Sequence, residues 1–496
     1  MTTDEAATVS TGREATERPR ALQARVHISR AQLAVLFAIL LAIPFVRPVD
    51  PDFWWHLRTG DLIVNSGIPR HDPFSWTRSG DPWVAHEWLS EALIYLVQTT
   101  LGYWANVLVF AGAAIGAMTL MYALGRRRGA GTRVLVLLSL VSTVVLASYV
   151  TVRPQLWSWL LFAAFVVIVE RRSAGERAPV WALPLLMAVW TNLHLGFVYG
   201  FLVLGAWFAG AAYERLRGRP VDLREPALAA AACAVATFAN PHGPAILLYP
   251  LRYFEDAGQL RFVAEWQRPD IRAPLLWPQF LTMVLLAFSA VAKGRPRPFL
   301  VALSLASIAL GLQAIRNGPY PALLLPGVAG PALARRWRFA SAHADASTSL
   351  RWGFAWAPAA AAFVLALSVG HRATDTFSFG DPSEDRYPVE ALGYVKEEQP
   401  GARLFNDYTW GGYIIARGFP ETRVFIDGRT DFYRGPLIDE YVRIAKAEAG
   451  WQEALDRRGV DVVLVQDGSS LARALRLEDG WDEVVIAGRG AVFVRR

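Results

Sequence analysis

Two aspartates that flank a proline, Asp50 and Asp52, have the strongest potential for chemistry in this sequence. They follow an apolar stretch directly, and the aromatic residues Phe53, Trp54 and Trp55 come next. A carboxylate at the boundary between water and hydrocarbon can stay ionised and still face a partly desolvated cavity, which suits a general base or a metal ligand. We therefore predict that both aspartates are catalytic, while the tryptophans by themselves would also fit an interfacial aromatic belt.

Further polar residues accompany the ends of later apolar stretches. Arg153 and Arg316 lie where two arginines would suit a phosphate or diphosphate group. Taken singly, each of these polar residues, the arginines included, also has a plainer explanation as a helix cap, a turn residue or a snorkelling side chain. Ionisable groups at membrane depth nevertheless cost about 2.5 to 3.5 kcal/mol each and tend to line a path or a site. The substrate-binding residues predicted in this part are His56, His71, Asp72, Asn192, His194, His242, Glu265 and Asn317.

The histidines of the same region raise the question of a metal. His56, His71 and His86 could add a site for a divalent ion, Mg²⁺ or Mn²⁺, beside the carboxylates. Their spacing matches no compact ligand motif, so no residue is assigned to a metal and no cofactor is certain. The single cysteine, Cys233, excludes an intramolecular disulfide and a cysteine-based metal cluster.

The elements that must position these residues are membrane helices. Hydrophobic residues make up 53% of the 496 residues and charged residues 19%, with a mean hydropathy of +0.26, which indicates a polytopic α-helical membrane protein. A bilayer core of about 30 Å needs about 20 apolar residues per helix, and we predict about eleven transmembrane helices. Their approximate ranges are 31–48, 104–124, 133–152, 155–170, 179–193, 196–213, 226–240, 276–292, 298–314, 318–334 and 352–369.

Basic residues in the short loops predict the orientation. They occupy every second loop, which places the N-terminus in the cytoplasm and the C-terminus outside. The formal net charge of +7 is then a topology signal, and we expect no nucleic-acid partner. Residues 1–30 are predicted to be a disordered cytoplasmic tail without a cleavable signal peptide, and 31–370 to be the membrane domain. We expect a multi-pass protein of a bacterial-type cytoplasmic (inner) membrane.

The first outer loop, 49–103, is too long and too polar for a mere connector, and long loops usually carry function. Its second half, from Trp88 to Tyr103, has the pattern of an amphipathic helix that lies along the membrane surface.

The composition changes after about His371, and 371–496 reads as an extracytoplasmic α/β domain. We predict strands at 402–406, 423–427, 460–465, 483–487 and 491–494, and helices at 411–416, 436–457 and 469–475. Two strand-to-helix turns carry NDYTWGGY and IDGRTDFY, and open α/β sheets bind ligands at such turns, although glycines and Asx residues there also fit simple turn formation. The substrate-binding residues predicted here are Asn406, Asp407, Trp410, Asp427, Arg429 and Asp431.

This layout resembles the GT-C superfamily of polyprenyl-phosphate-dependent glycosyltransferases. Protein O-mannosyltransferases and oligosaccharyltransferases are most similar in layout, and many bacterial membrane proteins share the first-loop wording D-x-D-x-W-W-H-L-x-T-G, which begins here at Asp50. The turn from Asp407 to Tyr413 is similar to the WWDYG motif of oligosaccharyltransferases. It departs from that motif, because Phe405 and Asn406 replace the two tryptophans and two residues are inserted.

The resemblance implies a function. A polyprenyl-phosphate or polyprenyl-diphosphate donor would enter from the outer leaflet, its phosphate would meet Arg153 and Arg316, and Asp50 or Asp52 would act as base or metal ligand near a glycan, lipid or protein acceptor. The implied reaction inverts the anomeric carbon. A non-catalytic envelope scaffold is the main alternative. A transporter is less favoured, because we find no internal repeat and the polar groups lie at one face.

Overall fold

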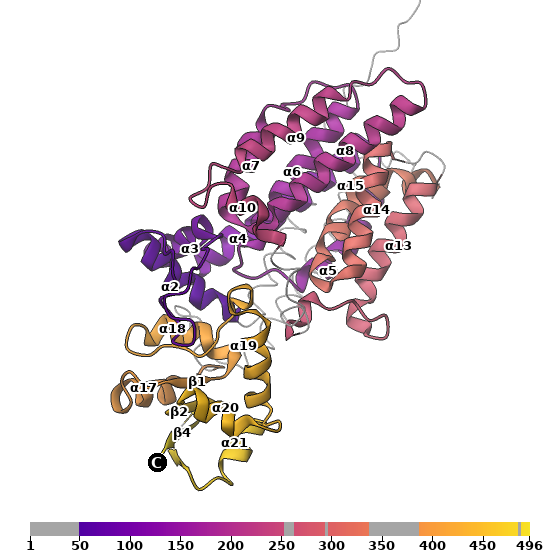
Figure 1. Cartoon of the computed structure of the whole chain (residues 1–496). Coiled ribbons are helices and arrows are strands. Elements are labelled where there is room, and N and C mark those ends of the chain that lie inside the picture. Colours follow the sequence, from indigo (N-terminus) through magenta and orange to yellow (C-terminus); the bar gives the residue numbers. More distant parts are fainter. Residues whose placement is uncertain (1–48, 252–261, 293–295, 337–385, 485–487) are drawn as a thin grey trace, which may run out of the picture.

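A bundle of helices and a small domain that contains a β-sheet make up the chain (Figure 1). The computed structural model describes residues 49–251, 262–292, 296–336, 386–484 and 488–496. The first and the eleventh predicted spans, the predicted tail and most of the segment 371–388 lie outside the described residues.

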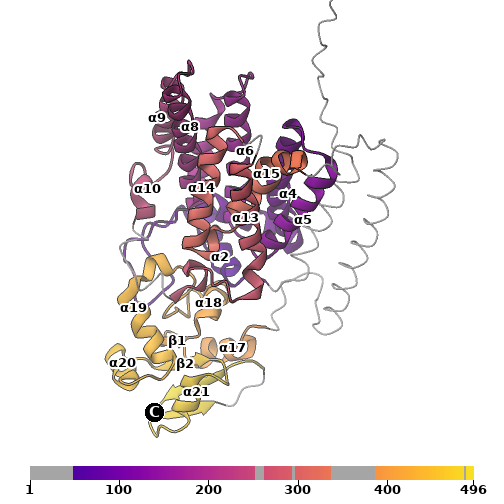
Figure 2. The ribbon, with the colours of Figure 1, turned by 90° about the vertical axis from the view of Figure 1, so that its right-hand side faces the viewer.

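The bundle helices of the described chain lie at the positions of the second to the tenth predicted span, and most of them run along a common direction (Figure 2). They are α4 (Tyr103–Arg127), α5 (Thr132–Ala147), α6 (Gln155–Ser173), α7 (Ala182–Leu193), α8 (Val198–Leu216), α9 (Arg224–Ala236), α13 (Trp277–Val291), α14 (Pro298–Gln313) and α15 (Pro319–Arg336).

Three of the described helical stretches are long and apolar enough to cross a membrane by length and composition: Tyr103–Arg127, Leu195–Leu216 and Pro274–Val291. Thr132–Ala147, Ala182–Leu193 and Pro298–Gln313 are apolar but shorter. The total of about eleven spans therefore stays a prediction.

Two helices form the outer loop, α2 (Pro51–Ser66) and α3 (Trp88–Leu101). We did not predict α2, although its start has a clear local cause: Asp50 is the N-cap, Pro51 occupies the first turn, and Asp50 Oδ1 accepts the backbone N–H of Asp52 at 3.0 Å. The helix α3 corresponds to the predicted amphipathic helix. The two helices pack closely at Gly60, where a Cβ would collide with the Glu91 carbonyl.

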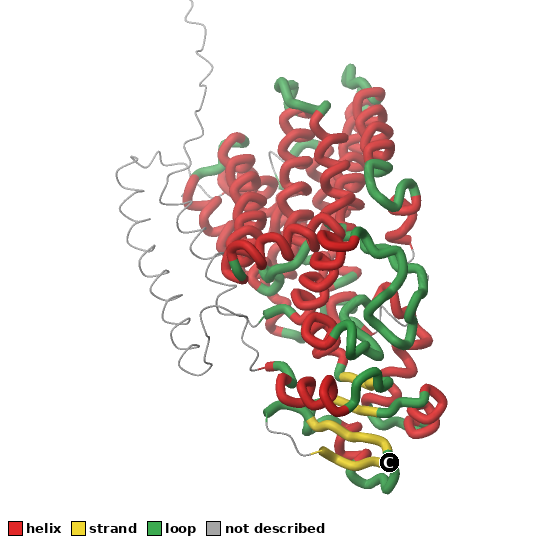
Figure 3. The backbone as a smooth tube through the Cα atoms, turned by 90° about the vertical axis from the view of Figure 1, so that its left-hand side faces the viewer, coloured by secondary structure: helices red, strands yellow, loops and turns green. Residues whose placement is uncertain are grey.

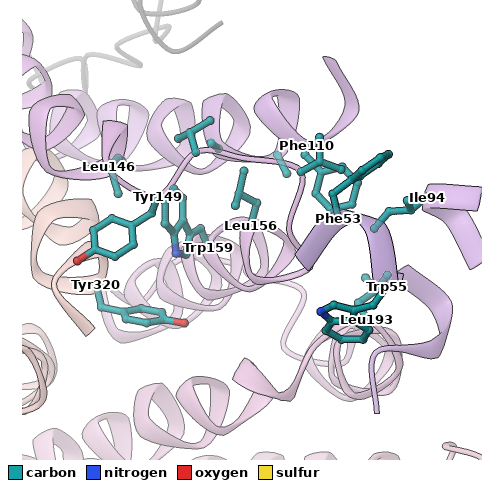
Figure 4. Close-up of a cluster of buried hydrophobic side chains, with 14 of the residues drawn as sticks. Phe53, Trp55, Ile94, Phe110, Leu146, Tyr149, Leu156, Trp159, Leu193 and Tyr320 are labelled. Atoms are coloured by element: carbon teal, nitrogen blue, oxygen red, sulfur yellow. The ribbon is translucent and has the colours of Figure 1, made fainter. Parts of the chain in front are cut away.

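A continuous apolar core joins α2 to the bundle (Figure 4). The fully buried ring of Phe53 packs edge-on against Tyr103 at the start of α4, with ring centroids 5.1 Å apart. Farther along the cluster, Trp159 of α6 and Tyr320 of α15 are also buried. Since Phe53 follows Asp52 directly, this packing also fixes the position of the aspartate pair.

The C-terminal part contains a β-sheet, whose strands are yellow in Figure 3. The sheet has four strands in the order β1-β2-β4-β3. The strand pair β1/β2 is parallel, and β2/β4 and β3/β4 are antiparallel. The elements in order are α17 (Val389–Glu398), β1 (Leu404–Asn406), α18 (Gly411–Gly418), α19 (Thr430–Ala445), α20 (Trp451–Arg458), β2 (Val462–Val465), α21 (Ser470–Leu475), β3 (Trp481–Val484) and β4 (Ala491–Arg495).

The predicted strand at 423–427 is not part of this sheet. Val424 forms a parallel bridge with Ser75 of the outer loop instead: its N–H donates to the Phe74 carbonyl and its carbonyl accepts from Trp76 N–H, both at 3.1 Å. The apolar run Val424 to Ile426 is fully buried by this arrangement. The outer loop thus completes the C-terminal domain.

The helices predicted over 436–457 are α19 and α20, although α19 begins earlier, at Thr430, and Gly450 with a φ of 84° directly precedes α20. The strand predicted at 483–487 begins earlier, as β3, and its residues 485–487 lie outside the described residues. The helix α17 was not predicted.

Candidate functional site

A cavity of about 280 Å³ lies where the outer loop, the ends of bundle helices and the C-terminal domain meet. Eight of the residues predicted to act on the substrate line it: Asp52, His56, Arg153, His194, Glu265, Arg316, Arg429 and Asp431. Residues about 380 positions apart in the sequence therefore contribute to one site.

Asp52 has the environment of a base. It lies in the first turn of α2, and its Oδ1 accepts a hydrogen bond of 3.1 Å from Trp55 Nε1. Burial raises the pKa of Asp52 to about 6, and the nearby Asp50 charge adds to the increase, although Arg153 acts against it. At neutral pH Asp52 is mostly ionised and still a much stronger base than an exposed aspartate.

Like Asp52, whose Oδ1 and Oδ2 bond to Trp55 and Arg153, Asp50 has both of its oxygens engaged. Its Oδ1 caps α2, and its Oδ2 accepts from Thr151 Oγ1 at 3.0 Å and lies 2.9 Å from Arg153 Nε. The lining residues of the cavity include Asp52 but not Asp50. This geometry favours Asp52 as the base. Asp50 instead caps α2 and helps to orient Arg153, which also pairs with Asp52.

Arg153 differs from the expectation that it binds phosphate. Its guanidinium pairs with Asp50, with Asp52, and with Glu265, whose Oε1 lies 3.0 Å from Nη1. Three carboxylates thus neutralise this cation and use its hydrogen-bonding groups. Arg153 positions the aspartates in this structure.

Arg316 fits the phosphate-binding prediction better. Its guanidinium lies 4.2 Å from the centre of the Trp266 ring, in a cation–π contact. Among the residues that the structure describes, no carboxylate forms an ion pair with it. Since Arg316 also lines the cavity, its charge is available to an anionic ligand.

Glu87 lies among three histidines and was missed by the sequence analysis. Its Oε1 lies 3.4 Å from His194 Nε2 and 3.7 Å from His86 Nε2, and its Oε2 lies 3.7 Å from His56 Nε2. Burial raises the pKa of Glu87 to about 7. One sequence feature could have identified Glu87 as a site residue: it is an acid that directly follows a histidine at the start of the predicted amphipathic helix.

The histidine tautomer around Glu87 follows from the backbone. His194 Nδ1 accepts the Gly196 N–H at 2.8 Å, so its proton lies on Nε2, which faces Glu87. Burial also lowers the pKa values of His56 and His194 well below their usual range. At neutral pH the imidazoles of His56 and His194 are therefore neutral, and they lie beside a carboxyl group whose pKa is close to neutrality.

The possible divalent-metal site stays a prediction. Among the described residues, no group of three or more His, Cys, Asp or Glu side chains is found that could hold a metal ion. His56 and His86 line the cavity, whereas His71 is exposed and does not line it.

Asp72 and Asp427 also differ from their predicted substrate-binding role. Both pair with Arg429, at 2.8 Å and 2.7 Å, and the three residues are at most 2% exposed. Arg429 further lies over the Trp83 ring, 4.6 Å from its centre. This buried network joins the outer loop to the C-terminal domain, and neither aspartate lines the cavity.

The turn residues at β1 are structural as well. Asn406 is fully buried and ties β1 to the neighbouring segment, because it donates to the Ile426 carbonyl at 2.9 Å and accepts from Phe425 N–H at 2.8 Å. Asp407 accepts the Thr409 N–H at 2.8 Å and caps a short helix. Trp410 Nε1 donates to a backbone carbonyl at 3.2 Å. The structure thus favours turn formation for these residues.

The remaining predicted residues make hydrogen bonds between separate segments of the chain. Asn192 accepts a hydrogen bond of 2.7 Å from Trp88 Nε1, and Asn317 accepts one of 2.5 Å from the Tyr199 hydroxyl. His242 Nε2 lies 3.4 Å from the Ala85 carbonyl. None of these three lines the cavity.

Glycines let the C-terminal domain approach Asp52. A Cβ at Gly428, in the turn IDGR, would collide with Asp52 Oδ1, and a Cβ at Gly412 would collide with the Pro51 carbonyl. Both predicted turns therefore touch the start of α2, and their glycines are needed for this contact.

Comparisons with known proteins find similarity at the level of the fold. No family model and no curated protein matches the chain. Among solved structures, the arabinofuranosyltransferase AftD from Mycobacteria is similar over 94% of this chain, with a TM-score of 0.51 and 15% identity. ArnT from Cupriavidus metallidurans, solved with bound undecaprenyl phosphate, is similar over 93% of this chain and 97% of its own length, with a TM-score of 0.50 and 14% identity.

The chain spans 40% of the length of AftD. Together with the apolar helices, these similarities show a multi-pass membrane protein that shares the fold of these two structures. At 14–15% identity they show the fold alone.

Proposed function

We propose that the protein is a membrane glycosyltransferase that moves a sugar from a polyprenyl-phosphate or polyprenyl-diphosphate donor to an acceptor hydroxyl. The observation that carries the proposal is that Asp52, a partly buried carboxylate, and Arg316, a cation without a carboxylate partner among the described residues, line one cavity. Base and phosphate-binding cation are the two groups that such a transfer needs. The fold supports the same reaction class.

The proposed reaction is one displacement. The Asp52 carboxylate takes the proton of the acceptor hydroxyl while that oxygen bonds to the anomeric carbon from the face opposite the leaving group. The bond between the anomeric carbon and the donor phosphate oxygen breaks, and its electron pair leaves with the phosphate, so the configuration inverts. Arg316 stabilises the charge that develops on the phosphate, in a cavity of low dielectric constant.

Arg153 acts on this reaction through Asp52. Its ion pairs hold Asp52 and Asp50 in one orientation and oppose the rise in the pKa of Asp52. Since no metal-binding arrangement is found among the described residues, each proposed step uses side chains of the chain itself.

We also propose the location of the reaction. With the predicted orientation, the C-terminal domain and the cavity lie outside the cytoplasmic (inner) membrane of a bacterial-type cell. The donor reaches the cavity from the outer leaflet, and the acceptor is a glycan, a lipid or a protein of the envelope.

The experiment is a transfer assay with the full-length protein in lipid nanodiscs and a panel of radiolabelled polyprenyl-phosphate sugars. We expect Asp52→Asn to lower turnover by about 10² to 10⁴-fold at unchanged donor binding, because it removes only the base. Arg316→Gln should weaken donor binding as well as turnover. Arg219→Gln, at an exposed arginine of another loop, is the matched control.

The result would contradict the proposal if folded wild-type protein neither transferred nor bound any donor of the panel. Unchanged turnover in Asp52→Asn would disprove the assignment of the base. A protein that binds donors and keeps them intact would instead support the scaffold alternative.

A further inference from the structure

A second polar cavity, of about 500 Å³, lies at the other end of the bundle. Helix α6 connects the two cavities: Gln155 at its first residue lines the cavity with Asp52, and Glu170 and Arg171 near its last residue line the second one. The 19 residues of α6 correspond to about 28 Å of helix, close to the bilayer core of about 30 Å. The second cavity therefore lies at the opposite membrane face, which the basic loops mark as cytoplasmic.

Arginines from separate elements converge on this cavity. Its lining contains five of them and two glutamates, so the formal charge is strongly positive. The arginines come from the end of α4, the residue after it, the end of α6, the start of α14 and α15: Arg127, Arg128, Arg171, Arg297 and Arg335. If these arginines served only to orient the protein in the membrane, they would need to lie in the loops of one face. That role does not require their guanidinium groups to line one cavity.

The two glutamates hold the arginines in place without neutralising all of them. Glu170 is almost fully buried and pairs with both Arg297 and Arg128, the latter at 3.3 Å. Glu176 pairs with both Arg127 and Arg171. Each carboxylate is thus shared by two cations.

Two of the guanidinium groups keep N–H groups for a ligand. Among the described residues, Arg127 and Arg297 each bond to a glutamate through one terminal nitrogen, and both side chains are about 40% exposed. Arginine carries five N–H donors in a planar fork that matches phosphate oxygens. Leu124 and Ala174 add apolar contacts beside them.

We infer that this cavity is a binding site for a phosphate group at the cytoplasmic face. Basic pockets between membrane helices on this side suit the headgroups of anionic phospholipids, and a soluble phosphate compound offers the same chemistry. The inference does not depend on the transfer reaction, because it uses a separate cavity and separate residues.

The test is retention of anionic phospholipid by the purified full-length protein, measured by native mass spectrometry after exchange into nanodiscs of phosphatidylglycerol, cardiolipin or phosphatidylcholine. We expect bound phosphatidylglycerol or cardiolipin but not phosphatidylcholine, and about tenfold weaker retention in the double variant Arg127→Gln and Arg297→Gln. The matched control Arg219→Gln, at an exposed arginine of the same predicted face outside the cavity, should retain lipid as the wild type does.

A second variant and a second arm complete the test. Arg127→Lys with Arg297→Lys keeps charge and topology but removes the planar forks, and we expect intermediate retention from folded protein. Displacement of the lipid by millimolar inorganic phosphate, or thermal stabilisation by phosphate alone, would assign the site to a soluble phosphate. Equal retention of phosphatidylcholine, or equal loss in Arg219→Gln, without any effect of phosphate, would overturn the inference.

Discussion

At the scale of single residues, the cavity separates carboxylates that differ by their partners. Asp50 and Asp52 are two positions apart and both pair with Arg153, yet only Asp52 lines the cavity, and burial raises its pKa to about 6. Glu87 faces the same cavity, and its pKa is raised to about 7. Pairs of titratable groups with separated pKa values often divide the work of acid–base chemistry between them.

The pH dependence of transfer should therefore be bell-shaped. Below the pKa of Asp52, about 6, the base is protonated, so kcat/KM should fall tenfold per pH unit. Above the pKa of Glu87, about 7, an additional negative charge enters the cavity and opposes the donor phosphate, so kcat/KM should fall again. A profile of kcat/KM between pH 4.5 and 9 in nanodiscs checks both limbs, and a flat profile between pH 5 and 7 would argue against Asp52 as the base.

The variant Glu87→Gln tests whether Glu87 causes the expected fall in kcat/KM above pH 7. The amide keeps the shape of the side chain but cannot ionise, so we expect the fall above pH 7 to disappear and the fall below pH 6 to remain. The same measurement on Glu265→Gln serves as control, because Glu265 pairs with Arg153 and lies in the same cavity. Persistence of the upper limb in Glu87→Gln would mean that another group causes it.

At the scale of elements, the contact between the turn IDGR and the start of α2 determines the shape of the cavity. Gly428 leaves no room for a side chain against Asp52 Oδ1. The turn and the base therefore cannot move independently.

Gly428→Ala should lower kcat/KM by about 10 to 100-fold while the protein stays folded, because a displacement of the base by about 1 Å can cost that much. Gly393→Ala in α17 is the matched control, since a Cβ there meets no neighbouring atom. Transfer assays beside thermal melting curves check the prediction. Equal effects of both variants on melting and turnover would show that position 428 has no specific role.

At the scale of the whole molecule, the outer loop and the C-terminal domain are one body. The Ser75–Val424 bridge and the ion pair of Arg429 with Asp72 join segments that are more than 340 residues apart in the sequence, and Asp427 holds the same guanidinium from its own turn. Since residues of both segments line the cavity, its shape depends on this junction.

Asp72→Asn should destabilise this junction. The variant leaves Arg429 with one carboxylate in a buried setting, and breaking a buried ion pair costs about 3 to 5 kcal/mol. We expect a lower melting temperature of the purified protein. Asp81→Asn, at an exposed ion pair of the same loop, should change it little, because such pairs contribute about 0 to 1 kcal/mol. Equal melting temperatures of both variants would contradict a structural role for Asp72.

The sequence by itself determined the class of the protein and much of its secondary structure. Apolar runs and glycine-rich turns act locally, so helices at the positions of the second to tenth predicted spans, together with α3, β1, β2 and β4, were predictable. Two solved glycosyltransferase structures share the fold. The pair Asp50 and Asp52 could also be recognised from the sequence, because an aspartate beside an apolar stretch is unusual whatever the rest of the fold is.

Only the tertiary structure decided the partners of the charged residues. The position of Arg153 in the sequence predicted a phosphate-binding role, but three carboxylates from two distant segments pair with it. Arg316 has no carboxylate partner among the described residues. Glu87 became a site residue only when three histidines from separate segments met around it. The reason is physical: the charge state and availability of a side chain depend on burial and on neighbours within a few ångströms, and long-range folding brings those neighbours together.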